Sequence, residues 1–173
     1  MALIARAAFQ NEIFTEIDST LYYDLPPTKR NPEGFRIYPG HRMLKKNMPQ
    51  YYPGIVGGKT GYTSLAGNTL VTCAERDGVR LIAVVLNGHS THYVDTKALL
   101  DFGFRNFQSL DVADYDTTYP SITNDMSIAG LPTTDLSVLH VQSDCRITLP
   151  AGADFSDTVS TISYDLPEDA PSD

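Results

Sequence analysis

Gly-Ile-Val-Gly-Gly-Lys-Thr-Gly-Tyr, residues 54–62, is the stretch that decides the fold, and two more strand-like runs follow it at 68–74 and 80–86. The lengths of these runs and their β-branched residues predict three consecutive strands near 55–63, 68–76 and 79–87. Asp77-Gly78 links the second run to the third and is a strong hairpin signal, so these strands are expected to pair antiparallel. Residues 81–86 are apolar throughout, which predicts burial on both faces of the third strand.

Helical spacing flanks the strands. Apolar residues in 2–10 predict a helix that ends at Asn11, and 13–17 predict a second short helical turn. After the strands, the apolar stripe of 91–102 predicts a helix that stops at Gly103. Residues 20–23 are a candidate strand, whereas 24–40 are rich in proline and glycine and predict a long loop.

The 173 residues carry 13 Lys and Arg against 21 Asp and Glu, a formal net charge of −8. A surface that wraps nucleic acid needs a basic face, so no nucleic-acid partner is expected. The only two cysteines, Cys73 and Cys145, lie far apart, and no spacing of Cys, His or carboxylates suits a metal site. We expect no metal and no cofactor. No apolar run reaches transmembrane length, and no signal peptide is visible.

The composition changes after Leu110. Residues 111–173 contain one Arg, no Lys and many Asp, Thr and Ser, with short strand-like runs at 137–141, 146–149 and 159–164. This pattern predicts an α+β chain in two parts, with an antiparallel sheet and helices in 1–110 and a small β-rich module in 111–173.

Lys59-Thr60-Gly61 is the motif that carries chemistry. On a strand edge, its backbone can pair with an extended ligand. Lys59 supplies a positive charge for a carboxylate and for proton transfer, Thr60 supplies a hydroxyl for the same carboxylate, and Gly61 permits close approach. The N–H of Tyr62 can join an oxyanion hole.

These features resemble the serine-type D-alanyl-D-alanine carboxypeptidases, which are low-molecular-mass penicillin-binding proteins. In that family Lys-Thr-Gly accompanies Ser-x-x-Lys and Ser-x-Asn motifs. The resemblance covers nearly the whole chain and includes segments 52–63, 66–71, 76–78, 81–86, 95–104, 149–156 and 164–168.

The resemblance implies that 1–110 are the C-terminal portion of a β-lactamase- or transpeptidase-like catalytic domain and that 111–173 are part of the β-rich domain behind it. It implies removal of the terminal D-alanine from peptidoglycan stem peptides through an acyl-enzyme, and binding of β-lactams by the complete protein. Lys59 is the candidate catalytic residue, and Thr60, Gly61, Tyr62 and Arg42 are candidate substrate-binding residues. The complete protein would lie in the bacterial cell envelope, with any membrane contact made through other segments.

The chain departs from the family pattern because it contains no Ser-x-x-Lys and no Ser-x-Asn. The expectation is therefore an internal fragment that is inactive by itself. The alternative is a truncated protein that binds peptidoglycan or a partner without chemistry. His92 stands where the family often has Arg, and His41 and His92 are both expected at the surface. An ordinary surface role competes with substrate binding for Arg42, and a solvated lysine competes with catalysis for Lys59.

Overall fold

The computed structural model describes residues 1–115, 127–128, 131–132 and 145–159, and it divides the chain into two compact units, Met1–Ser109 and Leu110–Asp173. The fold is α+β with antiparallel sheets, as predicted. No helix among these described residues has the length and apolar character needed to cross a membrane.

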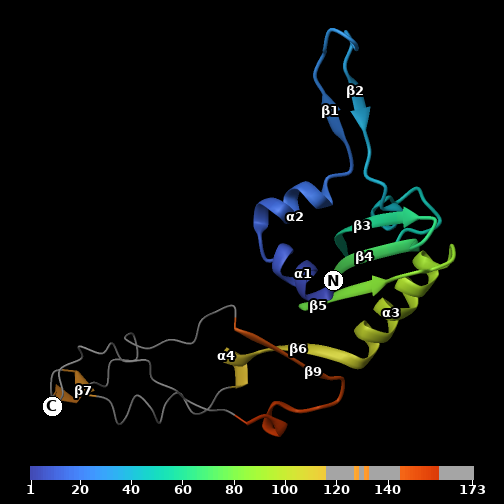
Figure 1. Ribbon diagram of the computed structural model, residues 1–173. Helices are drawn as coiled ribbons and strands as arrows, with labels where there is room; N and C mark the ends of the chain where they lie inside the picture. Colours follow the sequence, from blue (N-terminus) through green and yellow to red (C-terminus); the bar gives the residue numbers. More distant parts are fainter. Residues whose placement is uncertain (116–126, 129–130, 133–144, 160–173) are drawn as a thin grey trace. The chain divides into compact units, whose positions relative to one another are not determined.

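The first unit is built around a three-stranded sheet (Figure 1). Strands β3 (Ile55–Thr63), β4 (Gly67–Arg76) and β5 (Val79–Val85) pair antiparallel in the order β3-β4-β5, which confirms the three predicted strands. Asp77 and Gly78 have φ angles of 50° and 76°. Positive φ at both central residues is what a tight two-residue hairpin requires, so this dipeptide sets the β4–β5 register.

Helices cover both faces of this sheet (Figure 1). Helices α1 (Ala2–Ala8) and α2 (Glu12–Ser19) lie on one face, and α3 (His92–Asn106) lies on the other. Successive residues of β4 alternate between two cores, as the pleat requires. Cys73 packs with Ala5 and Phe9 of the α1 side, whereas the opposite core consists of Met43, Tyr52, Leu70, Ala74, Ala83 and Leu100.

The burial predicted for 81–86 is confirmed only in part. Ala83 and Val85 are buried, and Leu81 and Ile82 are half-buried on opposite faces, each packed against one of the two cores. Leu86 is 62% exposed. It lies beyond the end of β5, where neither helical layer covers it.

The predicted helix stop at Gly103 is wrong, because α3 continues through this residue to Asn106. Gly103 is buried, and a Cβ at this position would contact the Leu81 side chain, with Cγ at 3.4 Å. The glycine therefore allows α3 to approach β5 closely. The helix ends when Phe107 adopts extended backbone angles.

The predicted loop at 24–40 is also wrong. Strands β1 (Tyr23–Leu25) and β2 (Phe35–Ile37) pair antiparallel as a hairpin that projects from the unit (Figure 1). Arg36 joins Asp24 across the pair through a bidentate ion pair, with Nε–Oδ1 at 2.6 Å and Nη2–Oδ2 at 2.8 Å. The candidate strand at 20–23 overlaps β1 only at Tyr23. A short 3-10 helix, η1 (Arg42–Leu44), follows the hairpin.

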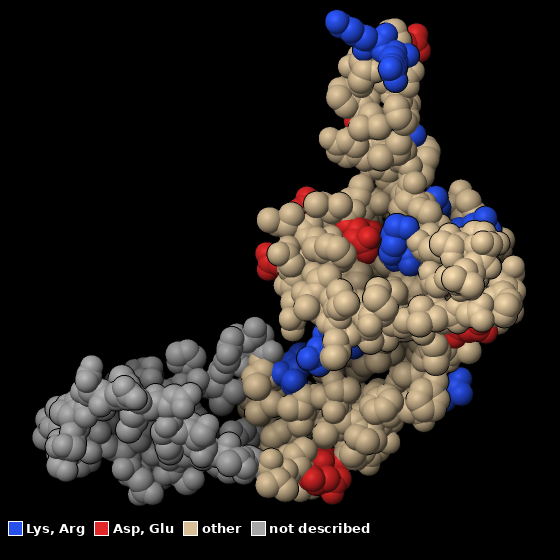
Figure 2. Space-filling view, viewed as in Figure 1, with Lys and Arg blue, Asp and Glu red and all other residues tan. Residues whose placement is uncertain are grey.

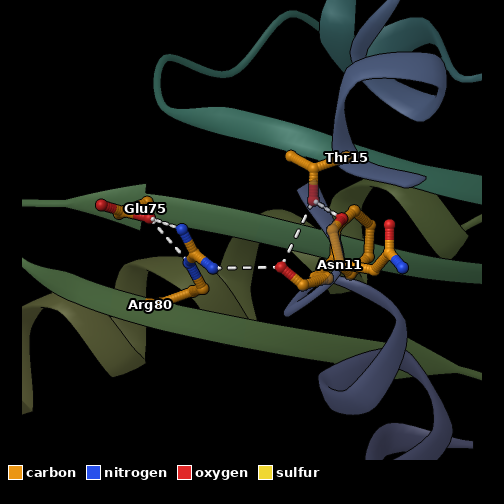
Figure 3. A network of polar contacts seen from close by, with 5 residues as sticks. Asn11, Thr15, Glu75 and Arg80 are labelled. Atoms are coloured by element: carbon orange, nitrogen blue, oxygen red, sulfur yellow. Dashed lines mark hydrogen bonds and ion pairs between the residues drawn. The ribbon is translucent and has the colours of Figure 1, made fainter. Parts of the chain in front are cut away.

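Arg80 ties the α1–α2 junction to the sheet (Figure 3). Its guanidinium pairs with Glu75 at 2.6 Å and donates to the Phe9 carbonyl oxygen at 3.2 Å. The Thr15 hydroxyl lies 3.3 Å from the same oxygen and 3.0 Å from the Asn11 carbonyl oxygen. The Asn11 side chain also caps α2 by accepting the Phe14 N–H, so α2 has a defined start above β3.

Strand β6 (Phe107–Asp111) crosses the boundary between the units. In the second unit β7 pairs antiparallel with β8, and the Tyr115 and Phe155 rings stack with centroids 5.4 Å apart. The described elements here are α4 (Val112–Tyr115), β7 (Ser127–Ile128), β8 (Leu131–Pro132), β9 (Arg146–Pro150) and η2 (Phe155–Asp157). The run expected at 146–149 coincides with β9. The run at 137–141, and 159–164 beyond its first residue, lie outside the described residues.

Candidate functional site

The Lys59-Thr60-Gly61 motif lies in β3, which pairs with β4 on one side and has no other strand partner in the described part of the chain. Two contacts show which peptide groups face the open edge. The Asp18 carboxylate accepts the Gly58 N–H, and the Lys59 ammonium donates to the Thr60 carbonyl oxygen at 2.5 Å. Peptide groups alternate in direction along a strand. Residues 58, 60 and 62 therefore turn their N–H and C=O groups away from β4, and the Tyr62 N–H points to the open edge.

The side chains of the motif alternate between the two faces of the sheet. Lys59 is exposed and lies on the α1–α2 face, in line with its register partner Val71. Thr60 lies on the opposite face and is half-buried, and Tyr62 is 71% exposed. The motif thus offers a cation on one side of the strand edge and a hydroxyl on the other.

Asp18 of α2 is a neighbour of the motif that the sequence analysis missed. Partial burial raises the pKa of its carboxyl, while the Gly58 N–H and the Lys59 charge oppose that rise. A Cβ at Gly57 would lie 2.5 Å from Asp18 Oδ2 and 2.9 Å from Phe9 Cε1. Glycine at this position therefore lets α2 bring a carboxylate against the strand.

His41 lies beneath the strand on the other face and is only 1% exposed, so its predicted surface location is wrong. Its Nδ1 accepts the Met43 N–H at 3.3 Å, and its Nε2 lies 2.9 Å from Thr72 Oγ1. This pattern assigns the proton of the neutral ring to Nε2. Burial is the main cause that lowers the pKa of His41 from 6.5 to about 4. The imidazole is therefore neutral at neutral pH.

Gly58 separates this imidazole from the strand edge. Its φ is +155°, and a Cβ there would contact the Val71 carbonyl oxygen and lie 2.7 Å from His41 Cδ2. Only glycine allows the strand to lie this close to the ring. The position of the motif is therefore set from both faces, by Asp18 on one and by His41 on the other.

Arg42 is placed by η1, which packs against β3. Its backbone N–H donates to the Tyr93 hydroxyl at 3.2 Å, and that hydroxyl donates to the Gly40 carbonyl oxygen at 3.3 Å. His92, at the start of α3, is half-buried rather than at the surface as predicted. Burial and the nearby Arg42 charge lower the pKa of His92, against the opposing effect of Asp95.

The structure therefore brings four of the five predicted site residues together on β3 and places the fifth, Arg42, on a neighbouring element. It adds Asp18 and His41, whose roles depend on contacts distant in sequence. A glycine pair directly before the motif, Gly57-Gly58, was the available signal for such close packing. Among the described residues, no group of three or more Cys, His, Asp or Glu is arranged to hold a metal ion.

This arrangement matches solved penicillin-binding proteins. Mutants of the Streptomyces K15 DD-transpeptidase share it with a TM-score of 0.53 and 27% identity, over 60% of this chain and 40% of that one. A peptidoglycan synthesis regulatory factor (PBP3) from Streptococcus pneumoniae has a TM-score of 0.57 at 23% identity, over 85% of this chain and 37% of that one, which is evidence for the fold alone. The class defined by the fold is therefore that of the DD-transpeptidases and penicillin-binding proteins.

Sequence comparison narrows the class. The D-alanyl-D-alanine carboxypeptidase family model matches residues 1–90, more than half of the chain, and the chain belongs to this family. D-alanyl-D-alanine carboxypeptidase DacB2 of Mycobacterium tuberculosis is 32% identical over 111 residues, covering 60% of this chain and 35% of the relative. DacF of Bacillus subtilis is 30% identical over 112 residues, covering 63% and 27%. The chain thus spans about a third of the length of these curated relatives.

Proposed function

We propose that this chain supplies one wall of the acyl-transfer site of a serine-type D-Ala-D-Ala carboxypeptidase. Such an enzyme removes the terminal D-alanine from peptidoglycan stem peptides through an acyl-enzyme. The observation that carries the proposal is the open edge of β3, where Lys59-Thr60-Gly61 is exposed and alternate peptide groups point away from the sheet. Family membership supports the assignment.

Each residue of the edge has a proposed role. The stem peptide lies along β3 as an added strand and bonds to the peptide groups of residues 60 and 62. Lys59 stabilises negative charge during acyl transfer, and the Thr60 hydroxyl and Arg42 bind the terminal carboxylate of the substrate. Gly61 leaves space for the ligand backbone, and the Tyr62 N–H donates to the developing oxyanion. A serine and its paired lysine from a Ser-x-x-Lys segment would supply the nucleophile and base.

The proposal extends to the whole protein. Residues 1–110 belong to the catalytic domain, and 111–173 are part of a β-rich domain that follows it. The substrate is a stem peptide ending in D-Ala-D-Ala, and β-lactams are its inhibitors. The site of action is the bacterial cell envelope, outside the cytoplasm.

The chain as given is proposed to be inactive, because none of its serines is followed by lysine at the third position. Acyl transfer needs a hydroxyl held beside a base and aimed at the same carbonyl as the oxyanion donors. The test is incubation of the purified chain with a fluorescent penicillin, followed by denaturing electrophoresis. We expect no label. A labelled 19.0 kDa band that unlabelled β-lactam competes away would show that the chain has its own nucleophile.

The catalytic role of Lys59 is tested in a longer protein that joins this chain to segments carrying Ser-x-x-Lys and Ser-x-Asn. There, Lys59→Ala should slow acylation by β-lactam and hydrolysis of a D-Ala-D-Ala peptide roughly 100- to 1000-fold, the cost of one preorganised charge-stabilising group. The control is Lys97→Ala, which removes an exposed lysine from α3. Unchanged acylation by the Lys59 variant would reject the assigned role.

The absence of both serine motifs from the chain favours a second candidate, binding of peptidoglycan without chemistry. This candidate predicts that no joined protein acylates but that the isolated chain retains polymer. Acylation of the joined protein at its Ser-x-x-Lys serine would decide for the enzyme.

A further inference from the structure

Two hollows meet at the base of the β1–β2 hairpin, and Tyr22 and Tyr38 line both of them. The larger hollow has a volume of about 620 Å³ and is also lined by Lys45, Lys46 and Met48. The smaller, of about 550 Å³, is also lined by Tyr23, Ile37 and Pro39. We call this continuous feature the hairpin groove. None of the roles proposed for the β3 edge uses it.

The tyrosines of the hairpin groove are exposed although they are large and partly apolar. Tyr22 is 49% exposed and Tyr38 is 63% exposed. Each ring has a cation near its face, Arg36 at 4.0 Å from the Tyr22 centroid and Lys45 at 5.6 Å from that of Tyr38. An exposed group of aromatic side chains in a concave surface is typical of a binding site. Tyrosine suits a ligand that is apolar on one side and polar at its edge, as a sugar ring is.

The charge of this region is opposite to that of the chain. Residues 22–48 contain six Lys and Arg against two Asp and Glu, a local charge of +4 in a chain of −8. Figure 2 shows basic side chains at the outer end of the projecting hairpin and on the body near its base. One of the two acidic residues, Asp24, is already paired with Arg36. The groove is therefore complementary to a ligand that carries several negative charges.

The hairpin groove is also continuous with the Lys59 strand. Pro39 lines the groove, and the next residue, Gly40, lies so close to Thr60 that a Cβ would be 3.1 Å from its Oγ1. A chain-like ligand that leaves the groove along this segment reaches the open edge of β3. A ligand with sugar rings, carboxylates and an extended peptide meets all three conditions.

We propose that the hairpin groove binds the polymeric part of peptidoglycan, an anionic glycopeptide, and holds it so that a stem peptide reaches the β3 edge. The proposal rests on the proposed function and specifies its substrate as polymer rather than free peptide. Sugar rings pack on Tyr22 and Tyr38, and stem-peptide carboxylates bind Lys45 and Lys46. The charge pairs are solvent-exposed, so added salt should weaken the binding.

The test measures binding of the purified 173-residue chain to insoluble peptidoglycan sacculi by co-sedimentation, and to a soluble disaccharide-peptide by calorimetry. Two variants address the groove, Tyr38→Ala and the double variant Lys45→Glu with Lys46→Glu. The matched control is Lys97→Glu, on the exposed side of α3. Circular dichroism of every variant verifies that the fold is intact. We expect affinity for both ligands to fall about tenfold in the groove variants, as for loss of a few exposed contacts, and to stay within about twofold in the control.

Wild-type affinity in both groove variants would overturn the proposal. So would equal or tighter binding to an oligonucleotide or to anionic lipid vesicles through the same lysines, since the groove would then recognise charge alone. The joined protein separates this proposal from the proposed function. There the double variant should raise KM for polymer relative to KM for a short D-Ala-D-Ala peptide. If the unmodified joined protein hydrolyses neither substrate, the proposed function fails, while the sedimentation result still decides whether the groove binds polymer.

Discussion

Acidification should destabilise the fold through His41. This imidazole is 1% exposed, and its hydrogen bonds to Met43 and Thr72 fit the neutral ring. Its pKa is lowered to about 4 in the folded chain, against 6.5 for an ordinary histidine. The folded state therefore binds fewer protons than the unfolded state between these two values. The stabilisation is complete above the unfolded pKa and is lost progressively as the pH falls towards the folded one.

The size of the effect follows from the two pKa values. A shift of this size at one site costs about 2 kcal/mol of unfolding free energy between about pH 7 and about pH 5. The loss reaches about 3 kcal/mol near about pH 4 and changes little at lower pH. This is a substantial part of the stability of a small domain.

Urea unfolding followed by circular dichroism, at several pH values, measures the loss. His41→Asn removes the titrating group and keeps a hydrogen-bonding side chain, so its stability should fall less steeply with acid than that of the wild type, by about 2 kcal/mol. His89→Asn, at an exposed histidine, should follow the wild-type curve. If wild type and His41→Asn lose the same free energy over this range, the imidazole is not held neutral by burial and the reasoning is wrong.

Two further predictions concern the sheet. Gly58→Ala should destabilise the chain by about 3 kcal/mol in urea unfolding, because its backbone angles and its contact with the Val71 carbonyl exclude a Cβ; Gly40→Ala should change stability by about 1 kcal/mol or less, and equal effects would contradict the packing described. Cys73 is fully buried and burial raises its pKa to about 11, so a thiol reagent should label exposed Cys145 in the native chain and both cysteines only after denaturation.

The sheet was predictable because its signals are local. The Asp77-Gly78 turn and the β-branched runs on either side of it depend only on neighbouring residues, and all three strands occur where they were expected. The motif Lys59-Thr60-Gly61 was visible for the same reason. Its place at an open edge of the sheet needed the strand order, which the sequence pattern does not contain.

The errors share a cause, which is contact between distant residues. Gly103 looked like a helix stop, yet its missing side chain makes room for Leu81. The prolines of 24–40 suggested a loop, whereas a cross-strand ion pair between Asp24 and Arg36 supports a hairpin there. His41 has a polar side chain in a polar segment, and only its packing against Thr72 buries it.

The consecutive order of β3, β4, β5 and α3 has a consequence for the folding rate. Neighbours in space are neighbours in the chain here, so segment 55–106 has a low contact order and should acquire structure early. The α1–α2 layer must close a longer loop, since Arg80 reaches the Phe9 carbonyl across 71 residues. Destabilising changes in the β4–β5 hairpin should therefore slow folding, whereas changes in α1 should mainly speed unfolding.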